Sequence, residues 1–184
     1  MDYSLLSVTH LQSTSDQQDA LRYAAIACAA PMSVTPEQAG NWAYPAAEMS
    51  DGELVVTMVK GLAGRLYLAG HLDRLSTHQT ALVREAVALH KQLRDWLATA
   101  TPCWPLGLPG WEDDVLALGY RGAGRRALIV WTRDGHRDVQ VPQEWASVAQ
   151  SYPQSPMWQV RQNDEGLTIG FPDGPGAAVF LSWD

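Results

Sequence analysis

The segment Arg65–Leu97 reads RLYLAGHLDRLSTHQTALVREAVALHKQLRDWL and joins a strand pattern to a helix pattern. Its first five residues, 65–69, predict a short strand. Ser76 and Gln79 form a capping box, in which each side chain accepts a hydrogen bond from the other residue's backbone N–H. The inward positions of the predicted helix recur every three or four residues, at Leu82, Val83, Ala86, Val87, His90, Leu93 and Leu97. A strand followed directly by a capped helix is the unit of a parallel α/β fold.

Two similar units precede this one in the sequence. Their predicted strands are Ser4–Leu11 and Met32–Thr35. Their predicted helices begin at capping boxes opened by Ser15 and Ser50, and Pro31 ends the first of these helices. Strand and helix therefore alternate three times, which predicts a parallel α/β arrangement for the first half of the chain.

The pattern changes near residue 102. Short apolar runs separated by Gly, Asp and Pro follow, at 115–120, 127–132, 139–141, 158–161, 167–171 and 177–183. Asp134 and Gly135 predict a tight turn between two of these runs. Repeated short strands with such turns predict an antiparallel sheet or sandwich. We therefore expect two parts, 1–101 and 102–184.

Composition argues against several classes of protein. The 184 residues carry a formal charge of −7, which disfavours binding along nucleic acid backbones. We expect no membrane span, because the apolar runs are too short, and no secretory signal, because the first twenty residues lack a basic start followed by an apolar stretch. Cys28 and Cys103 form no CxxC pair and the histidines show no ligand spacing, so we expect a cytoplasmic setting and neither metal nor cofactor.

Three strand–helix units form an incomplete fold. A parallel sheet needs both faces covered, and its edge strands can pair with other strands. A closed barrel takes about eight strands. We therefore expect the first half to belong to something larger, or to bind a protein partner or a second copy through its exposed strand edge.

Several stretches carry a resemblance to a known family. They are Ser15–Asp19 (SDQQD), the loop with Pro36 and Asn41-Trp42, Gly61–Ser76 (GLAGRLYLAGHLDRLS) and residues 90–94 (HKQLR). Together they resemble the C-terminal portion of glycoside hydrolase family 36, which consists mainly of α-galactosidases. Members of that family have a (β/α)8 barrel followed by an antiparallel β-sandwich. The resemblance implies that 1–101 are the last three βα units of the barrel, strands six to eight, and that 102–184 are the sandwich.

The resemblance also implies roles for single residues. The family has a Cys-x-Ser-Gly-Gly-Gly-Arg-x-Asp motif that helps to hold galactose, and then a Trp-x-Ser-Asp-x-x-Asp motif whose first Asp is the general acid/base. Asp16 matches that acid/base and Asp19 the trailing Asp. Asp2, fourteen residues before Asp16, matches the last Asp of the glycine motif. Trp42 either lines the sugar-facing rim or anchors the core. Without the resemblance, Asp16 is an ordinary aspartate at a helix N-terminus.

Other parts of the family's site do not occur in this sequence. The glycine run and the Lys-x-Asp nucleophile segment are missing, and Ser13 stands where the family usually has Trp. Gln17 replaces a second Asp of many members, and Asn41-Trp42 replaces their His. A retaining glycosidase needs two carboxylates about 5–5.5 Å apart. We therefore expect the chain to be inactive alone, as a truncated product, split subunit or relict of an α-galactosidase that binds a galactoside only when the barrel is completed. The alternatives are a non-catalytic carbohydrate-binding module and a structural partner of another chain.

Overall fold

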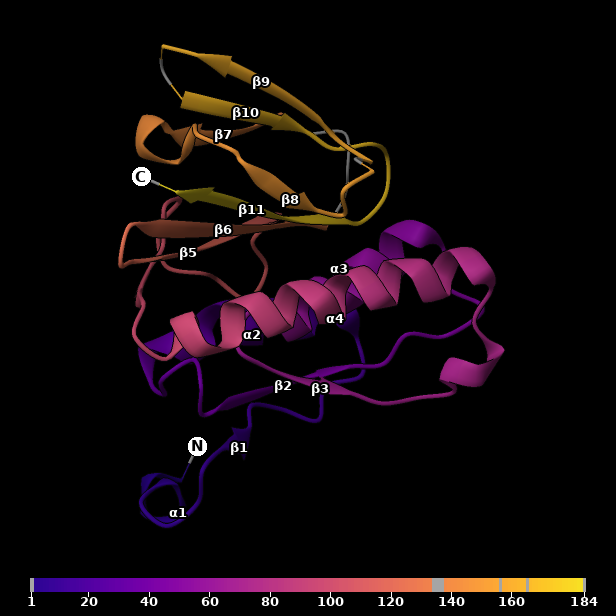
Figure 1. Ribbon diagram of the computed structural model, residues 1–184, viewed down its shortest axis with the longest axis vertical. Helices are drawn as coiled ribbons and strands as arrows, with labels where there is room; N and C mark the ends of the chain where they lie inside the picture. Colours follow the sequence, from indigo (N-terminus) through magenta and orange to yellow (C-terminus); the bar gives the residue numbers. More distant parts are fainter. Residues whose placement is uncertain (1, 134–137, 156, 165, 184) are drawn as a thin grey trace.

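The computed structural model describes residues 2–133, 138–155, 157–164 and 166–183. The chain is stacked in four layers, which are a parallel sheet, a layer of helices, a five-stranded antiparallel sheet and a three-stranded antiparallel sheet (Figure 1). The N-terminal residues lie at the end of the molecule away from the antiparallel sheets. No helix among the described residues is long and apolar enough to cross a membrane, and the cytoplasmic setting stays a prediction.

The parallel sheet contains three strands, in the order β1 (Gln12–Ser13), β2 (Ala39–Ala43) and β3 (Arg65–Leu68). Each strand is followed by a helix, namely α2 (Ala20–Ala29), α3 (Asp51–Leu62) and α4 (Thr77–Leu97). Short helical turns complete this half, at α1 (Tyr3–Leu6), η1 (Ala30–Met32) and η2 (Leu72–Arg74). The predicted alternation of parallel strands and helices is confirmed. Three strands do not make a barrel, so the barrel assignment stays a proposal.

Two predicted strands are wrong. Residues 4–11 are not a strand, because the Asp2 carboxylate accepts hydrogen bonds from the backbone N–H groups of Ser4 and Leu5 and so begins α1. Residues 32–35 are not a strand either, because the fixed φ of Pro31 suits the first turn of η1. The true second strand, β2, lies within the predicted loop. It consists largely of small residues, which let it lie close to the helices.

Two of the three predicted capping boxes are confirmed, at Ser50 with Glu53 and at Ser76 with the residue three positions on. The box at Ser15 is wrong. The N-cap of α2 is Asp19, whose Oδ1 accepts the N–H groups of Leu21 and Arg22, each at 2.9 Å. A carboxylate at this position satisfies two otherwise unpaired backbone donors and suits the positive end of the helix dipole.

The second half consists of two antiparallel sheets, as the sequence predicted. The larger has the order β4 (Thr101–Cys103), β5 (Val115–Gly122), β6 (Arg125–Thr132), β11 (Gly176–Trp183) and β8 (Gln150–Tyr152). The smaller has the order β7 (Asp138–Pro142), β10 (Gly166–Gly170) and β9 (Gln159–Asn163), and η3 (Gln143–Trp145) follows β7. The turn predicted at 134–135 lies outside the described residues.

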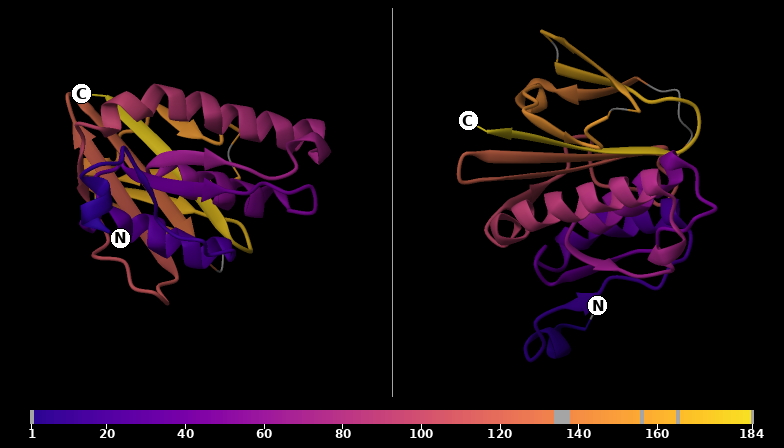
Figure 2. Two further views of the ribbon diagram at one scale, coloured as in Figure 1. Left: turned by 90° about the horizontal axis from the view of Figure 1, so that it is seen from below. Right: turned by 45° about the vertical axis from the view of Figure 1, so that its right-hand side comes forward.

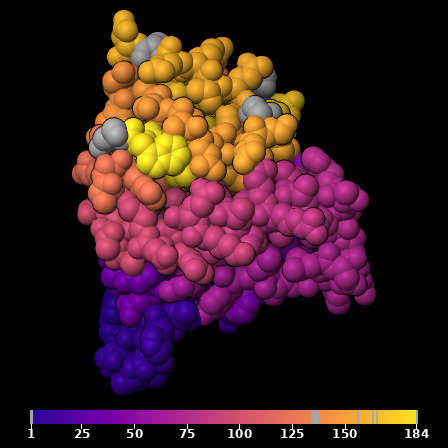
Figure 3. Space-filling view, viewed as in Figure 1, coloured from indigo at the N-terminus to yellow at the C-terminus, as the bar shows by residue number. Residues whose placement is uncertain are grey.

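The five-stranded sheet is buried on both faces. Along β6 and β11, Ile129 and Val179 pack against the helices, whereas Leu128 and Phe180 pack against the smaller sheet. This alternation follows from the two-residue period of a strand. One hydrophobic core therefore crosses the predicted boundary near residue 102. Figure 3 shows the two halves in continuous contact along one face of the molecule.

Candidate functional site

The helices cover only one face of the parallel sheet. Figures 1 and 2 show α2, α3 and α4 between this sheet and the antiparallel sheets, whereas the only described helix beyond the sheet is the short α1, at its β1 end. Leu66 and Ala43 point toward α3, since a Cβ added at Gly61 would meet both side chains. Neighbouring residues of a strand point to opposite faces, so Trp42, Tyr44 and Tyr67 lie on the uncovered face, which we call the open face.

Three aromatic side chains gather at the open face. Trp42 pairs with Tyr67 in the register of β2 and β3, and their rings meet edge to face with centroids 4.7 Å apart. Tyr44, two residues after Trp42, stacks on its indole at 5.5 Å with an angle of 10° between the planes. The Trp42 indole N–H donates to Ser13 Oγ at 2.8 Å. Gly40 leaves room for this cluster, because a Cβ there would lie 2.8 Å from the Tyr67 ring.

A buried polar network joins the same strands on the helix side. The hydroxyl of Tyr23, a fully buried residue of α2, accepts the backbone N–H of Trp42 at 2.9 Å and lies 2.9 Å from the Thr14 hydroxyl. Thr14 in turn donates to Asn41 Oδ1 at 2.7 Å. A hydroxyl has one proton, so Tyr23 is the donor to Thr14. The network holds the segment that leaves β1, which leads to Asp16, against β2.

Lys60 of α3 lies next to the Tyr23 ring of this network. It is only 2% exposed, and its Nζ lies 4.8 Å from the centroid of the Tyr23 ring. Burial lowers the pKa of Lys60 to about 8, and the charge of Asp19 opposes that shift. Burial also raises the pKa of Tyr23, and the Asp16 charge adds to the rise. The Tyr23 hydroxyl therefore stays protonated at neutral pH and acts as a hydrogen-bond donor.

The structure brings two of the four predicted site residues to one end of the sheet. Asp16 is exposed and lies three residues after the end of β1. Its charge contributes to the raised pKa of Tyr44, for which burial is the main cause and the neighbouring Tyr23 the second. Trp42 and Tyr44 lie at the end of β2. Because carboxyl ends of parallel strands meet at one edge, Asp16 and this aromatic pair share the edge where α/β proteins bind ligands.

Asp19 and Asp2 occupy different positions. The Asp19 carboxylate caps α2, whose first turn follows the Asp16 segment. Asp2 caps α1 and its N–H donates to Gln12, the first residue of β1. Leu6 of α1 packs against the small apolar cluster that includes Ala39, the first residue of β2. Asp2 therefore lies toward the amino ends of the strands, and the structure does not bring it to Asp16.

Sequence reasoning missed Tyr23 and Tyr44. Tyr44 lies two residues after Trp42, a spacing that puts both side chains on one face of a strand, but the predicted strand, 32–35, ends before either residue. Nothing in the sequence indicates the Tyr23 contacts, since its partners lie 9 and 19 residues away.

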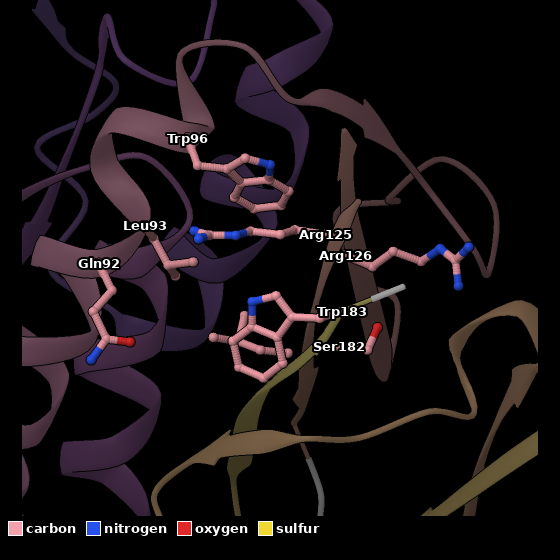
Figure 4. Close-up of a pocket in the computed structure, with 8 residues that line it drawn as sticks. Gln92, Leu93, Trp96, Arg125, Arg126, Ser182 and Trp183 are labelled. Carbon is pink, nitrogen blue, oxygen red and sulfur yellow. The ribbon is translucent and has the colours of Figure 1, made fainter. Parts of the chain in front are cut away.

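A pocket on the opposite side of the molecule is not a candidate sugar site. It lies between α4, β6 and β11, where Figure 4 shows Arg125 between the indoles of Trp96 and Trp183. Its volume is about 20 Å³, which suits a single water. Among the described residues, no group of three or more His, Cys, Asp or Glu side chains is arranged to hold a metal ion.

Comparison with known proteins places this geometry in context. No family model and no curated protein sequence matches the chain. Among solved structures, a variant of the GH36 α-galactosidase AgaA from Geobacillus stearothermophilus in complex with 1-deoxygalactonojirimycin superimposes with a TM-score of 0.68 at 10% identity, over 91% of this chain and 25% of that one. The galactosidase domain of α-galactosidase–sucrose kinase AgaSK gives 0.66 at 15% identity, also over 91% and 25%.

A second AgaA variant, in complex with raffinose, gives a TM-score of 0.65 at 12% identity over 92% of this chain and 25% of that one. At such identities the likeness shows the fold. The chain spans about a quarter of the length of these α-galactosidases. It therefore has the fold of a part of the glycoside hydrolase family 36 α-galactosidases, and the match is consistent with their C-terminal portion, the resemblance that the sequence predicted.

Proposed function

We propose that this chain is the C-terminal part of a retaining α-galactosidase-like hydrolase that cleaves terminal α-galactosides, with Asp16 as its general acid/base. One observation carries the proposal. Asp16 follows β1 at the carboxyl edge of a parallel sheet, in a fold that matches part of GH36 α-galactosidases. Barrel enzymes place catalytic residues at this edge.

The proposed chemistry needs a second carboxylate from another polypeptide segment. That nucleophile forms a covalent glycosyl intermediate, while Asp16 first protonates the leaving oxygen and then removes a proton from water. A general acid must hold its proton, and a neighbouring negative carboxylate favours the protonated form. The exposed Asp16 acquires such a neighbour only when further strands pair with the edge strands β1 and β3. The polypeptide that carries those strands completes the barrel and is the proposed protein partner.

Sugar binding is the proposed role of Asp19, Asp2 and the aromatic cluster that contains Trp42. Trp42 lies at the open face beside the Asp16 edge. For Asp19 and Asp2 the proposal rests on the resemblance, and both carboxylates cap helices in this structure.

Reconstitution tests the proposal. The chain is mixed with a polypeptide that carries the missing barrel strands and a Lys-x-Asp segment, and hydrolysis of 4-nitrophenyl α-galactoside is measured. We expect activity only in the mixture, with a loss of about 10³-fold or more for Asp16→Asn, since an acid/base contributes about 10²–10⁴-fold. Asp95→Asn, the same change at an exposed aspartate near the C-terminal end of α4, is the control. A stable complex that stays inert would refute the split-enzyme proposal.

A second candidate function is a non-catalytic carbohydrate-binding module or structural partner. The observation that favours it is that the aromatic cluster is formed by this chain alone. Galactoside binding by the isolated chain, weakened by Trp42→Ala, with no activity after assembly, would support this alternative.

A further inference from the structure

The contacts of Trp42 leave little of its ring for a ligand. Its indole N–H is used by Ser13, one neighbour stacks on it and a second meets it edge to face. Its backbone N–H is used by Tyr23. An aromatic side chain held in this way is a rigid support for the rings that pack against it.

Tyr44 has a different environment. It lies one residue beyond the end of β2, at the carboxyl edge, and it is partly exposed. Trp42 covers one face of its ring, and no other aromatic ring among the described residues stacks on it. The charge of Asp16 contributes to the raised pKa of Tyr44, after burial and the neighbouring Tyr23, so the carboxylate and the ring belong to one neighbourhood.

We propose that Tyr44, and not Trp42, is the aromatic residue that meets the sugar, and that Trp42 positions it. This inference rests on the proposed function, since it takes the ligand to be a galactoside. In galactopyranose the axial O4 leaves the C3–H, C4–H and C5–H bonds on one ring face, which forms an apolar surface for an aromatic ring. In glucopyranose the C4–H bond points to the other face. The stacked pair therefore favours galacto over gluco configuration.

Binding of methyl α-D-galactopyranoside to the full chain tests the inference, by NMR titration with saturation-transfer readout. Because the stacked pair is formed by this chain alone, we expect weak binding even before the barrel is completed, whereas hydrolysis needs the completed barrel. We expect Tyr44→Ala to weaken binding about tenfold, and Tyr44→Phe to stay within about threefold of wild type, because the ring and not the hydroxyl makes the contact. Tyr3→Ala is the matched control, since Tyr3 is an exposed tyrosine near the opposite ends of the strands. Methyl α-D-glucopyranoside should bind more weakly than the galactoside.

Wild-type protein supplies an independent readout should Tyr44→Ala not fold. Saturation of aromatic resonances should reach H3, H4 and H5 of the galactoside most strongly. Unchanged affinity of a folded Tyr44→Ala variant, a saturation pattern centred on H1 and H2, or no binding by wild type would each overturn the inference. None of these results decides the proposed function, which depends on activity in the reconstituted enzyme.

Discussion

The hydroxyl of Tyr23 accepts the backbone N–H of Trp42 at 2.9 Å, although the two residues belong to different elements, α2 and β2. The same hydroxyl donates to Thr14, just after β1. One buried side chain therefore sets the position of two strands and of the segment that carries Asp16. Its removal tests how much of the site depends on the helix layer.

Tyr23→Phe removes this hydroxyl and leaves the ring in place. The Trp42 N–H and the Thr14 hydroxyl then lose a partner in a buried site, so we expect a loss of about 1–3 kcal/mol of unfolding free energy. Urea denaturation measures it. Tyr3→Phe, at a residue that is 63% exposed, should leave stability unchanged. Equal stability of Tyr23→Phe and wild type would show that water replaces the lost contacts.

Lys60→Met should stabilise the protein below pH 8. Burial lowers the pKa of Lys60 from 10.5 to about 8, so between these values the unfolded chain binds more protons than the folded one. Stability of the wild type therefore rises with pH across this window, and the full cost of burying the charge applies below it. At about 1.4 kcal/mol per pKa unit, that cost is about 3 kcal/mol, less what the contact with the Tyr23 ring returns.

Urea denaturation at pH 7 and pH 10.5 checks the Lys60 prediction. The gain from Lys60→Met should be largest at pH 7 and should shrink toward pH 10.5. Lys91→Met, at an exposed position of α4, is the matched control and should show no such dependence. A gain that is the same at both pH values would point to side-chain packing instead of charge.

His90 should make the fold sensitive to acid. Burial, followed by the charges of Arg65 and Arg94, lowers the pKa of His90 from 6.5 to about 4. Between these values the unfolded chain binds the extra proton, so stability falls as the pH is lowered from 6.5 to 4. His90→Leu should remove up to about 3 kcal/mol of this loss of unfolding free energy between pH 6.5 and pH 4. Thermal unfolding between pH 4 and 7 measures it, with exposed His10→Gln as control, and an unchanged slope would contradict the prediction.

Local signals in the sequence predicted the helices better than the strands. The capping boxes at Ser50 and Ser76 were recognisable because both partners lie within one turn. The strand at 39–43 was not recognisable, since its Ala, Gly and Asn residues have low strand propensity and are held there by packing against the helices. Tertiary contacts therefore override the low strand propensity of these residues in β2.

The candidate site shows the same limit. Asp16 was predicted from a motif resemblance. That prediction depends on residue types and spacing, so the wrong strand and capping box predicted beside Asp16 do not affect it. Tyr44 depends on knowing where β2 ends, and Tyr23 on a contact between a helix and a strand. Residues whose role is to position others are defined by three-dimensional neighbours, so a single sequence gives no pattern for them.

Gly40 should be intolerant of any side chain, because the aromatic cluster occupies the space beside it. A Cβ at Gly40 would lie 2.8 Å from the Tyr67 ring and 3.1 Å from the Gln12 carbonyl oxygen, so the ring or β1 must move. We expect Gly40→Ala to cost about 1–3 kcal/mol of unfolding free energy, as overpacking does. Gly122→Ala is the control in another sheet, where the added Cβ meets its nearest neighbours at 3.5 Å.

The double variant Gly40→Ala/Tyr67→Ala identifies the cause of that loss. If the clash with the ring dominates, the second change should cost less in the Gly40→Ala background than in wild type, with a coupling of about 0.5–3 kcal/mol in urea denaturation. Additive losses would mean that the Gln12 carbonyl sets the limit, and that the constraint at Gly40 comes from strand pairing and not from the aromatic cluster.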